Sequence, residues 1–339
     1  MRGLLVLVAV ALALWCGYWF VGSSLIEREA EAAFQRLSAK GMRAGKTALY
    51  VKGFPNRFDL TVEGLDLADP ARKIGWQAPR LQIFAMTWKP WHIIAAFPGT
   101  QEFALPDQRL TLTGTNEMAS LRALPSTDLP LAEARLVGNA LHLTSDAGWT
   151  VGAASLALAL RADPARAGGY EFGLEATSLA PDPALTAALA AMRLPDLPPP
   201  DLPVLIDRLR ADLALTLTAG LDRHLGETRP QLSGLRINDL QLVWGPLRVT
   251  ASGEVSADAQ GLAAGRIEAQ ITGWDRLPAI LVASGAVRAE IAPTVAGMLK
   301  AGAAGGEILK LPLVLRDGQM SLGPLPLGPA PRLVLAPPG

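Results

Sequence analysis

The chain has 339 residues, of which 50% are hydrophobic and 18% are charged, and its 31 basic residues balance its 31 acidic ones. This composition excludes a disordered chain, and the zero net charge excludes a basic field for binding nucleic acid. One cysteine and three histidines exclude a disulfide framework and a Cys/His metal cage, so we expect neither a metal nor another cofactor.

The first 22 residues are expected to form a transmembrane anchor. Residues 3–22 carry no charge, and a helix of this length spans a hydrocarbon core of roughly 30 Å. Arg2 precedes the run and Glu27 follows it, so the positive-inside rule places the N-terminus in the cytoplasm and exports the body. The anchor residues singled out, three of them aromatic residues suited to the headgroup layer, are Leu4, Leu12, Trp15, Tyr18 and Trp19.

A cleaved signal peptide is the main alternative to this anchor. Residues 21–23 (VGS) resemble a small-residue cleavage site, but the apolar run exceeds the roughly 7–15 residues usual for such peptides. We therefore favour an uncleaved anchor. A helical stalk over residues 23–45 is expected to follow, ended by Gly41 and Gly45.

Beyond residue 45 the sequence alternates apolar and polar side chains. Phe58, Leu60 and Val62 alternate with charged and hydroxyl residues, and the pattern recurs over residues 213–217 and 267–271. Alternation indicates strands with one packed face and one solvated face, which is typical of antiparallel sheets. We predict a mainly β fold, with curled antiparallel sheets and a few helices behind the anchor.

The apolar phase changes within three of these segments, at Gly64, at Gly138 and at residues 238–239. A one-residue shift swaps the faces of a strand. Each break is therefore either a bulge or bend within one strand, or a tight turn between two short strands. Repeated bends would curl the sheet.

One hairpin can be registered from the sequence alone. Asp317-Gly318 is a strong signal for a two-residue turn between strands. The pairs it implies are Arg316 with Gln319, Leu315 with Met320, and Leu313 with Leu322. The apolar members of these pairs then share one face.

A proline-rich stretch is expected to separate two halves of the body. Residues 183–194 are alanine-rich and helical in character, and five prolines follow within residues 195–203, a stiff connector. The expected organisation is a β-rich half over residues 46–194, this connector, and a β-rich half over residues 204–339.

The second half is expected to contain a helical segment over residues 275–301, interrupted by Pro293 and packed on the sheet. The tail over residues 323–331 is too rich in proline for a paired central strand.

No motif of known chemistry occurs in the sequence. It contains no Gly-x-Ser-x-Gly elbow, phosphate-binding loop, dinucleotide fingerprint or zinc-protease motif. His142 lies near Ser145 and Asp146, but in an extended strand His142 and Ser145 point to opposite faces. We assign no catalytic residue and expect the protein not to be an enzyme.

One interval combines basic and aromatic residues. Residues 70–101 contain four basic side chains, three tryptophans and two phenylalanines, and no acidic side chain. Such a mixture suits contact with an anionic membrane surface, whereas ordinary strand core with a mildly basic outer face is the alternative. The candidate lipid- or membrane-contact residues are Trp76, Phe84, Trp88, Trp91, Phe97, Arg80 and Lys89.

Four short segments carry a resemblance to a known family: residues 14–20 (LWCGYWF), 53–59 (GFPNRFD), 92–95 (HIIA) and 323–329 (GPLPLGP). Through them the chain resembles, nearly end to end, a bacterial envelope family known as domain of unknown function 2125. The resemblance implies a Gram-negative envelope setting and brings no activity, ligand or active-site residue. More loosely, residues 244–253 are similar to strands of AsmA-type envelope proteins, a group implicated in phospholipid movement.

These features predict a single-pass protein of the bacterial inner membrane with a cytoplasmic N-terminus and a periplasmic body. We expect its curled sheet to bind membrane lipid or another hydrophobic ligand without catalysis, and to have neither a nucleic-acid nor a metal partner. A self-packed scaffold that binds another envelope protein is the alternative. An envelope hydrolase is a third interpretation, which no motif supports.

Overall fold

The computed structural model describes residues 2–194, 199–323 and 325–335. The chain divides into two compact units. The first unit comprises the chain up to Pro125 together with Ala134–Gly148, and the second comprises Ser126–Glu133 together with the chain from Trp149 onward. Each unit is described by itself.

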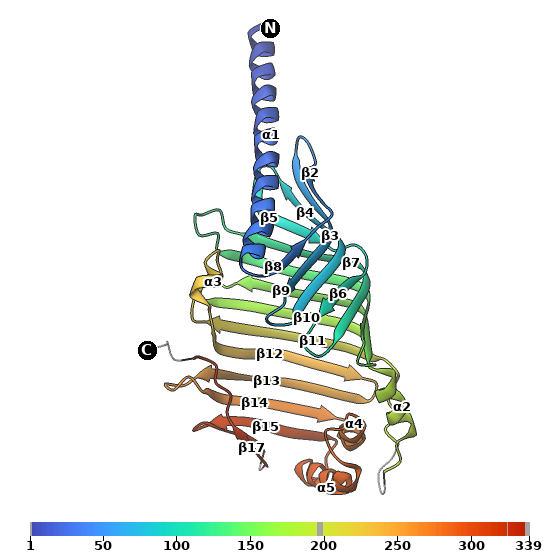
Figure 1. Cartoon of the computed structure of the whole chain (residues 1–339). Helices are drawn as coiled ribbons and strands as arrows, with labels where there is room; N and C mark the ends of the chain where they lie inside the picture. The colour runs from blue at the N-terminus through green and yellow to red at the C-terminus, as the bar shows by residue number, and fades with distance from the viewer. Residues whose placement is uncertain (1, 195–198, 324, 336–339) are drawn as a thin grey trace. The chain divides into compact units, whose positions relative to one another are not determined.

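The first unit is one long helix followed by strands (Figure 1). Its elements are α1 (Arg2–Ala39), β1 (Arg43–Gly45), β2 (Ala48–Lys52), β3 (Arg57–Asp69), β4 (Ile74–Met86), β5 (Lys89–Ala96), β6 (Gln101–Ala104), β7 (Arg109–Ala123) and most of β8 (Leu131–Ser145). β3 pairs with β1, β2 and β4, while β5 and β6 each pair with both β4 and β7. All of these pairings are antiparallel.

The second unit is a series of antiparallel strands with short helices between them. Its elements are β9 (Thr150–Ala162), β10 (Gly169–Ala180), α2 (Pro183–Ala191), β11 (Ile206–Leu217), α3 (Leu225–Thr228), β12 (Leu232–Trp244), β13 (Leu247–Ala257), β14 (Ala263–Thr272), η1 (Trp274–Arg276), α4 (Leu277–Ala283), η2 (Ala289–Ile291), α5 (Ala292–Gly302), β15 (Ile308–Arg316), β16 (Gln319–Leu322) and β17 (Leu325–Pro329). From β9 to β17, each strand pairs with the next. The predicted fold class, a mainly antiparallel β protein with few helices behind an N-terminal apolar helix, is confirmed.

The three phase changes lie inside continuous strands. Gly64 of β3 adopts a φ of +57°, while the register of β3 with β4 is the same before and after it, so the strand bends without a bulge. In β12 the register with β13 shifts between Ile237 and Leu240, which marks a bulge at residues 238–239. Gly138 lies within β8, where Ala140 has a φ of +47°. The alternative of a tight turn between two short strands is therefore wrong at all three positions.

The predicted hairpin is confirmed residue for residue. Arg316, Leu315 and Leu313 pair with Gln319, Met320 and Leu322. Asp317 and Gly318 adopt φ angles of +52° and +71°, the left-handed pair that a two-residue turn between twisted strands requires. β17 pairs with β16 at the edge of this arrangement, where prolines are tolerated.

The helical segment after β14 differs from the prediction in where it breaks. Pro293 does not interrupt a helix but lies in the first turn of α5, where its missing N–H would have no helical partner in any case. The interruption falls instead between α4 and α5, where Gly285 has a φ of +76°. The helices pack on the strands as predicted, because Ala279 of α4 shares a buried cluster with Trp244, Ile271 and Leu309.

Residues 195–198 of the expected proline connector lie outside the described residues. The described remainder, residues 199–203, leads from α2 towards β11. β10 and β11 pair with each other along their length, so the strands before and after the connector are neighbours in the second unit.

Helix α1 is uninterrupted from Arg2 to Ala39, so the expected anchor continues into most of the expected stalk, whose last residues, 43–45, form β1 instead of helix. Its later turns pack on the sheet of the first unit. Trp19 and Ile26 contact Val51 and Phe58, and Phe34 packs in a second cluster on the same strands. Glu27 accepts a hydrogen bond from the backbone N–H of Val51 at 2.8 Å, which fixes the helix to β2.

Candidate membrane and lipid contact surfaces

Residues 2–15 of α1 are exposed, with no described part of the first unit burying them. Leu4, Leu12 and the apolar side chains between them are exposed. The helix is long and apolar enough to cross a membrane, and a signal sequence would meet the same criterion of length and composition. An uncovered apolar helix of this length is costly in water and favourable in a bilayer.

The body holds the last apolar turn of α1. The Tyr18 hydroxyl donates to the carbonyl of Thr87 at 2.8 Å, and Trp19 Nε1 donates to the carbonyl of Arg57 at 2.7 Å. Trp19 is only 7% exposed and stacks beside Phe58. Of the predicted anchor aromatics, Tyr18 and Trp19 therefore tie the helix to the sheet, and Trp15 lies next to Tyr18 with ring centroids 5.9 Å apart.

Two turns of the sheet meet α1 at this level. We call the turn 53–56 between β2 and β3, together with residues 86–88 at the end of β4, the tip of the first unit. Its two parts are joined because Thr87, which is buried, donates to the carbonyl of Asn56 through both its N–H and its hydroxyl, at 3.1 and 3.2 Å. The Phe54 ring stacks on Phe20 of α1 at 5.6 Å and lies edge-on to Trp19 at 5.3 Å. In Figure 1, β2 accordingly runs up beside α1.

The structure distributes the seven predicted contact residues over several places. Trp88 lies at the tip and Lys89 beside it, and both are exposed, whereas Trp91 is half-buried in β5. Trp76 and Phe97 join Phe103 in a separate aromatic group, with centroids 6.0 and 6.5 Å from that of Trp76. Residues 76 and 88 are twelve positions apart, which amounts to about 40 Å along an extended chain.

Phe84 and Arg80 are engaged by β3. Phe84 pairs with Asp59, on the face opposite to that covered by α1, and Arg57 lies over its ring at 5.8 Å. Arg80 forms an ion pair with Glu63 at 3.6 Å. Acidic side chains of the neighbouring strand β3 thus lie beside the interval 70–101, which contains none of its own. The interval therefore does not form one basic surface.

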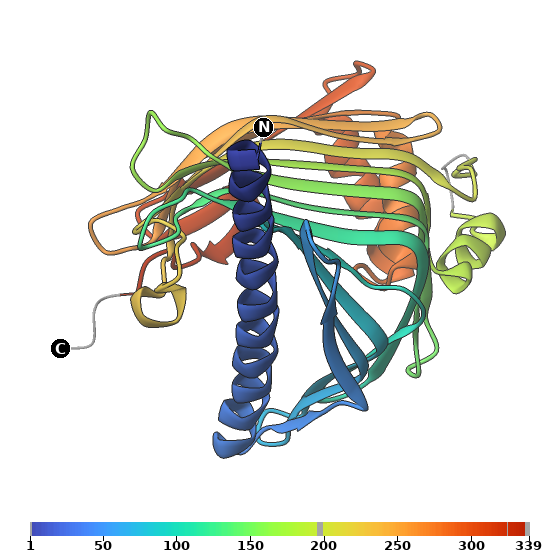
Figure 2. The same cartoon turned by 90° about the horizontal axis from the view of Figure 1, so that it is seen from above.

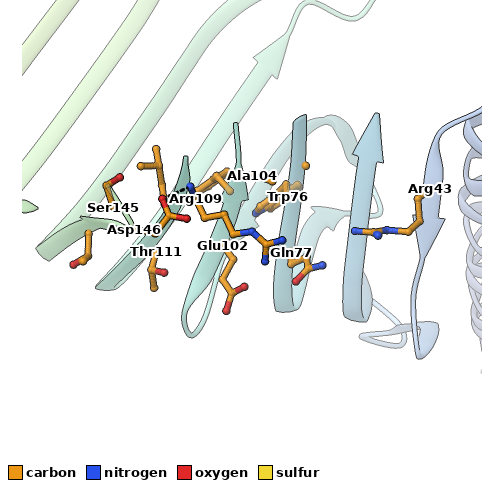
Figure 3. A pocket seen from close by; sticks show the side chains of 13 residues that line it. Arg43, Trp76, Gln77, Glu102, Ala104, Arg109, Thr111, Ser145 and Asp146 are labelled. Atoms are coloured by element: carbon orange, nitrogen blue, oxygen red, sulfur yellow. Dashed lines mark hydrogen bonds between the residues drawn. The ribbon is translucent and has the colours of Figure 1, made fainter. Parts of the chain in front are cut away.

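A cavity of about 390 Å³, lined by charged, polar and apolar side chains, lies where β4 and β7 begin (Figure 3). Trp76, Glu102, Arg109 and Asp146 are among its lining residues, and Arg43 reaches it while paired with Asp66 at 2.9 Å. Its two arginines face two carboxylates, so the cavity has no excess of either charge. His142 and Ser145 do not form a catalytic arrangement in this cavity. His142 is exposed, whereas Ser145 is buried and donates its hydroxyl to Gln108 Oε1 at 2.6 Å.

Beside this cavity lies a buried carboxyl group. Glu117 is 9% exposed, its Oε2 accepts from Gln101 Nε2, and its Oε1 has no hydrogen-bond partner among the residues that the structure describes. Burial raises the pKa of Glu117 above its ordinary value of 4.5, and the hydrogen bond from Gln101 offsets part of this rise. Gln101 in turn accepts from Trp76 Nε1 at 3.2 Å, so the aromatic group rests on this polar pair.

Replacing Glu117 by glutamine is expected to stabilise the chain at pH 7 and to change little at pH 4. A raised pKa means that the folded chain holds this proton more tightly than the unfolded chain does. The wild type therefore loses stability as the pH rises from about 4.5 through the raised pKa, and the variant lacks this loss. Urea unfolding of the wild type and the variant at both pH values measures the change in the free energy of unfolding, with the exposed Glu102→Gln as control. An equal change at pH 4 and pH 7 would contradict a raised pKa for Glu117.

The second unit presents an apolar face that extends across β9–β15. Residues directly opposite each other in neighbouring strands share a face, and the pairing aligns apolar side chains from strand to strand. One row consists of Leu160, Phe172, Leu213, Ile237, Gly253, Ile267 and Leu313. A second row consists of Leu158, Leu174, Ala211, Leu240, Ala251, Ala269 and Leu311. At about 4.8 Å per strand spacing, each row is about 29 Å long.

Both ends of this face are covered over the later strands. Towards one end, α2, α4 and α5 pack on Trp244, Leu247 and Leu309. Towards the other, Val255 and Leu315 are buried with Ala330 of the C-terminal tail. Between these ends, Leu158, Leu160, Phe172, Leu174 and Leu213 of β9–β11 are half-buried, and so are Ile237, Ile267 and Leu313 of β12, β14 and β15. Figure 2 shows these strands curving along their length, with α4 and α5 on the inner side of the curve.

The opposite face of the same strands is polar and charged. Arg161 pairs with Glu171 at 2.6 Å, Arg208 with Glu175 at 3.1 Å, and Arg236 with Glu254 at 3.0 Å. Such exposed pairs contribute little to stability, but they show which face is solvated. Within the described residues, no group of three His, Cys, Asp or Glu side chains is arranged to hold a metal ion.

Comparison with known proteins yields one family. Residues 19–331 match the family described as "Uncharacterized protein conserved in bacteria (DUF2125)". The match begins at Trp19, the residue at which α1 first becomes buried against the sheet. No curated protein and no solved structure matches the chain. Because the matched segment spans most of the sequence, the chain belongs to the bacterial DUF2125 family.

Proposed function

We propose that this chain is a membrane-anchored protein that binds lipid acyl chains on the apolar face of its second unit. The observation that carries the proposal is the half-buried stretch of this face over β9–β11, where aliphatic and aromatic side chains from three strands lie side by side. A monomeric soluble protein rarely leaves a large contiguous apolar surface without an occupant.

The dimensions and chemistry of the face suit an acyl chain. One acyl chain occupies about half of a hydrocarbon core that is roughly 30 Å thick. The apolar rows are longer than one such chain. Each methylene that leaves water gains about 0.8 kcal/mol. Because the rows contain neither a charge nor a hydroxyl group, they would hold a hydrocarbon without selecting a particular polar group.

The anchor supports a location at the bacterial envelope. Arg2 precedes the apolar run, and Glu27 and Glu29 follow it, so the positive-inside rule favours a cytoplasmic N-terminus and a periplasmic body. An uncleaved anchor is further supported by the burial of Trp19, because cleavage at residues 21–23 would remove that side chain from its place beside Phe58. The protein would then work at the surface of the inner membrane of a Gram-negative cell, without catalysis.

A photoreactive benzoylphenylalanine introduced at Phe172 is expected to cross-link to phospholipid in intact membranes. Phe172 lies on the apolar face, between Leu160 and Leu213. The matched control is Glu171, the preceding residue of the same strand, whose side chain points to the charged face and pairs with Arg161. Mass spectrometry of the cross-linked chain identifies the adduct. A protein adduct at position 172 would favour the envelope scaffold instead.

A further inference from the structure

The tip of the first unit carries exposed apolar side chains that packing within that unit does not explain. Phe54, Met86 and Trp88 are 51%, 42% and 54% exposed. They come from two turns that are tied together through Thr87, which is buried. The sequence pointed to Trp88 alone, because the closeness of the Gly-Phe-Pro-Asn turn to the end of β4 arises only from the pairing of β3 with β4.

The position of the tip along α1 fixes its depth. The tip is held by Tyr18 and Trp19, whereas the apolar run of the helix continues to Gly22, before Ser23 and Ser24. Four residues of helix correspond to about 6 Å. If the apolar run lies in hydrocarbon, the backbone carbonyls at Thr87 and Arg57 lie just below the level at which this run ends, which is the depth where aromatic side chains are favoured.

The exposed surface of α1 continues onto the tip. Phe20 is exposed on the helix and stacks on Phe54, which is exposed on the turn. Lipid that surrounds the helix at Phe20 therefore meets Phe54 next. The side chains that flank the tip, Lys52 and Lys89, are exposed and basic, and Arg57 is paired with Asp59 at 2.5 Å. A basic border around an apolar tip matches an anionic headgroup layer.

We propose that this tip is a second membrane contact, in which Phe54, Met86 and Trp88 insert into the headgroup and upper acyl region of the bilayer that α1 spans. The occupant is lipid, because the tip is continuous with the exposed surface of a helix that is long and apolar enough to cross a membrane. With a helix and two turns in one bilayer, the first unit is held at a fixed height and orientation instead of swinging on a tether. This contact does not depend on whether the second unit binds acyl chains.

The experiment uses the full chain with its single cysteine, Cys16, replaced by alanine. One new cysteine is placed at Phe54, at Trp88 or, as control, at Ala71, and each is labelled with an environment-sensitive nitrobenzoxadiazole dye. Ala71 is exposed in the turn after β3, at the opposite end of that strand from Phe54. The labelled chains are reconstituted into vesicles of phosphatidylethanolamine and phosphatidylglycerol, and Lys89→Cys replaces either tip variant that fails to fold.

At positions 54 and 88, the emission is expected to shift to shorter wavelength and to be lost when nitroxide-labelled lipid is added. At position 71, the emission is expected to stay at its aqueous wavelength and to be lost with iodide in the buffer. Iodide quenching at 54 and 88 equal to that at 71 would overturn the proposal. Protection of positions 54 and 88 from both nitroxide-labelled lipid and iodide would indicate a protein contact. That result would also overturn the proposal.

Discussion

Replacing Trp19 by alanine is expected to lower the free energy of unfolding of the first unit by about 3–5 kcal/mol, the range typical of large aromatic truncations in a core. Trp19 is buried between Val51 and Phe58, and its indole N–H donates to the carbonyl of Arg57 at 2.7 Å. The truncation removes this packing and leaves the carbonyl of Arg57 without its donor. Urea unfolding in detergent micelles, followed by circular dichroism, measures the loss.

The matched control for Trp19 is Leu14→Ala in the same helix. Leu14 is 70% exposed in the uncovered part of α1, so its truncation should change the free energy of unfolding by no more than about 0.5 kcal/mol. If both variants unfold alike, α1 is a passive tether and the packing of the helix on the sheet does not contribute to the fold. A selective loss for Trp19→Ala would show that the helix is part of the body, as expected of an uncleaved anchor.

Replacing Gly253 by alanine is expected to destabilise the second unit by about 3 kcal/mol, the upper part of the range for a backbone conformation that only glycine adopts readily. Gly253 has a φ of +148°, and a Cβ there would lie 2.2 Å from the carbonyl oxygen of Arg266 and 2.6 Å from the Cα of Ile267. Both atoms belong to the backbone of β14, which is paired on both sides. They cannot rotate away, so the ladder itself would have to shift.

Gly173→Ala is the control for this substitution. Gly173 also lies inside a paired strand of the second unit, but no atom lies within 4 Å of the position of its Cβ. This variant should be neutral or stabilised by about 0.5 kcal/mol, because alanine reduces the conformational freedom of the unfolded chain. Equal destabilisation by the two substitutions would contradict the close approach of β13 and β14. Thermal unfolding of the two variants side by side makes the comparison.

Local patterns predicted the elements of this fold well. Alternation identified the antiparallel strands, Asp317-Gly318 fixed one hairpin to the residue, and the uncharged run identified the apolar helix. Each of these features depends on residues that are close in sequence. Pro293 shows the limit of such patterns, because it lies in the first turn of α5 and does not interrupt a helix. Proline is compatible with both positions, and packing decides between them.

The candidate surfaces depend on contacts between distant residues, which the sequence did not reveal. The row from Leu160 to Leu313 exists only because seven strands pair in one particular register. Phe54 comes to lie against α1, and Met86 opposite Arg57, through the pairing of β2, β3 and β4, and no local pattern distinguishes them from other exposed residues. Likewise, Trp76 and Phe84 share an interval with Trp88 and nevertheless lie on different faces of β4, because they pair with Leu67 and Asp59, which lie on either side of the phase change at Gly64 of β3.

Adducts formed at two adjacent residues show whether the apolar face of β9–β11 holds lipid. With the photoreactive group at Phe172 we expect a phospholipid adduct; with the group at Glu171 we expect none, because that side chain faces solvent. Equal lipid yields at the two positions, or no lipid at position 172 in membranes where the chain is folded, would mean that this face holds no lipid.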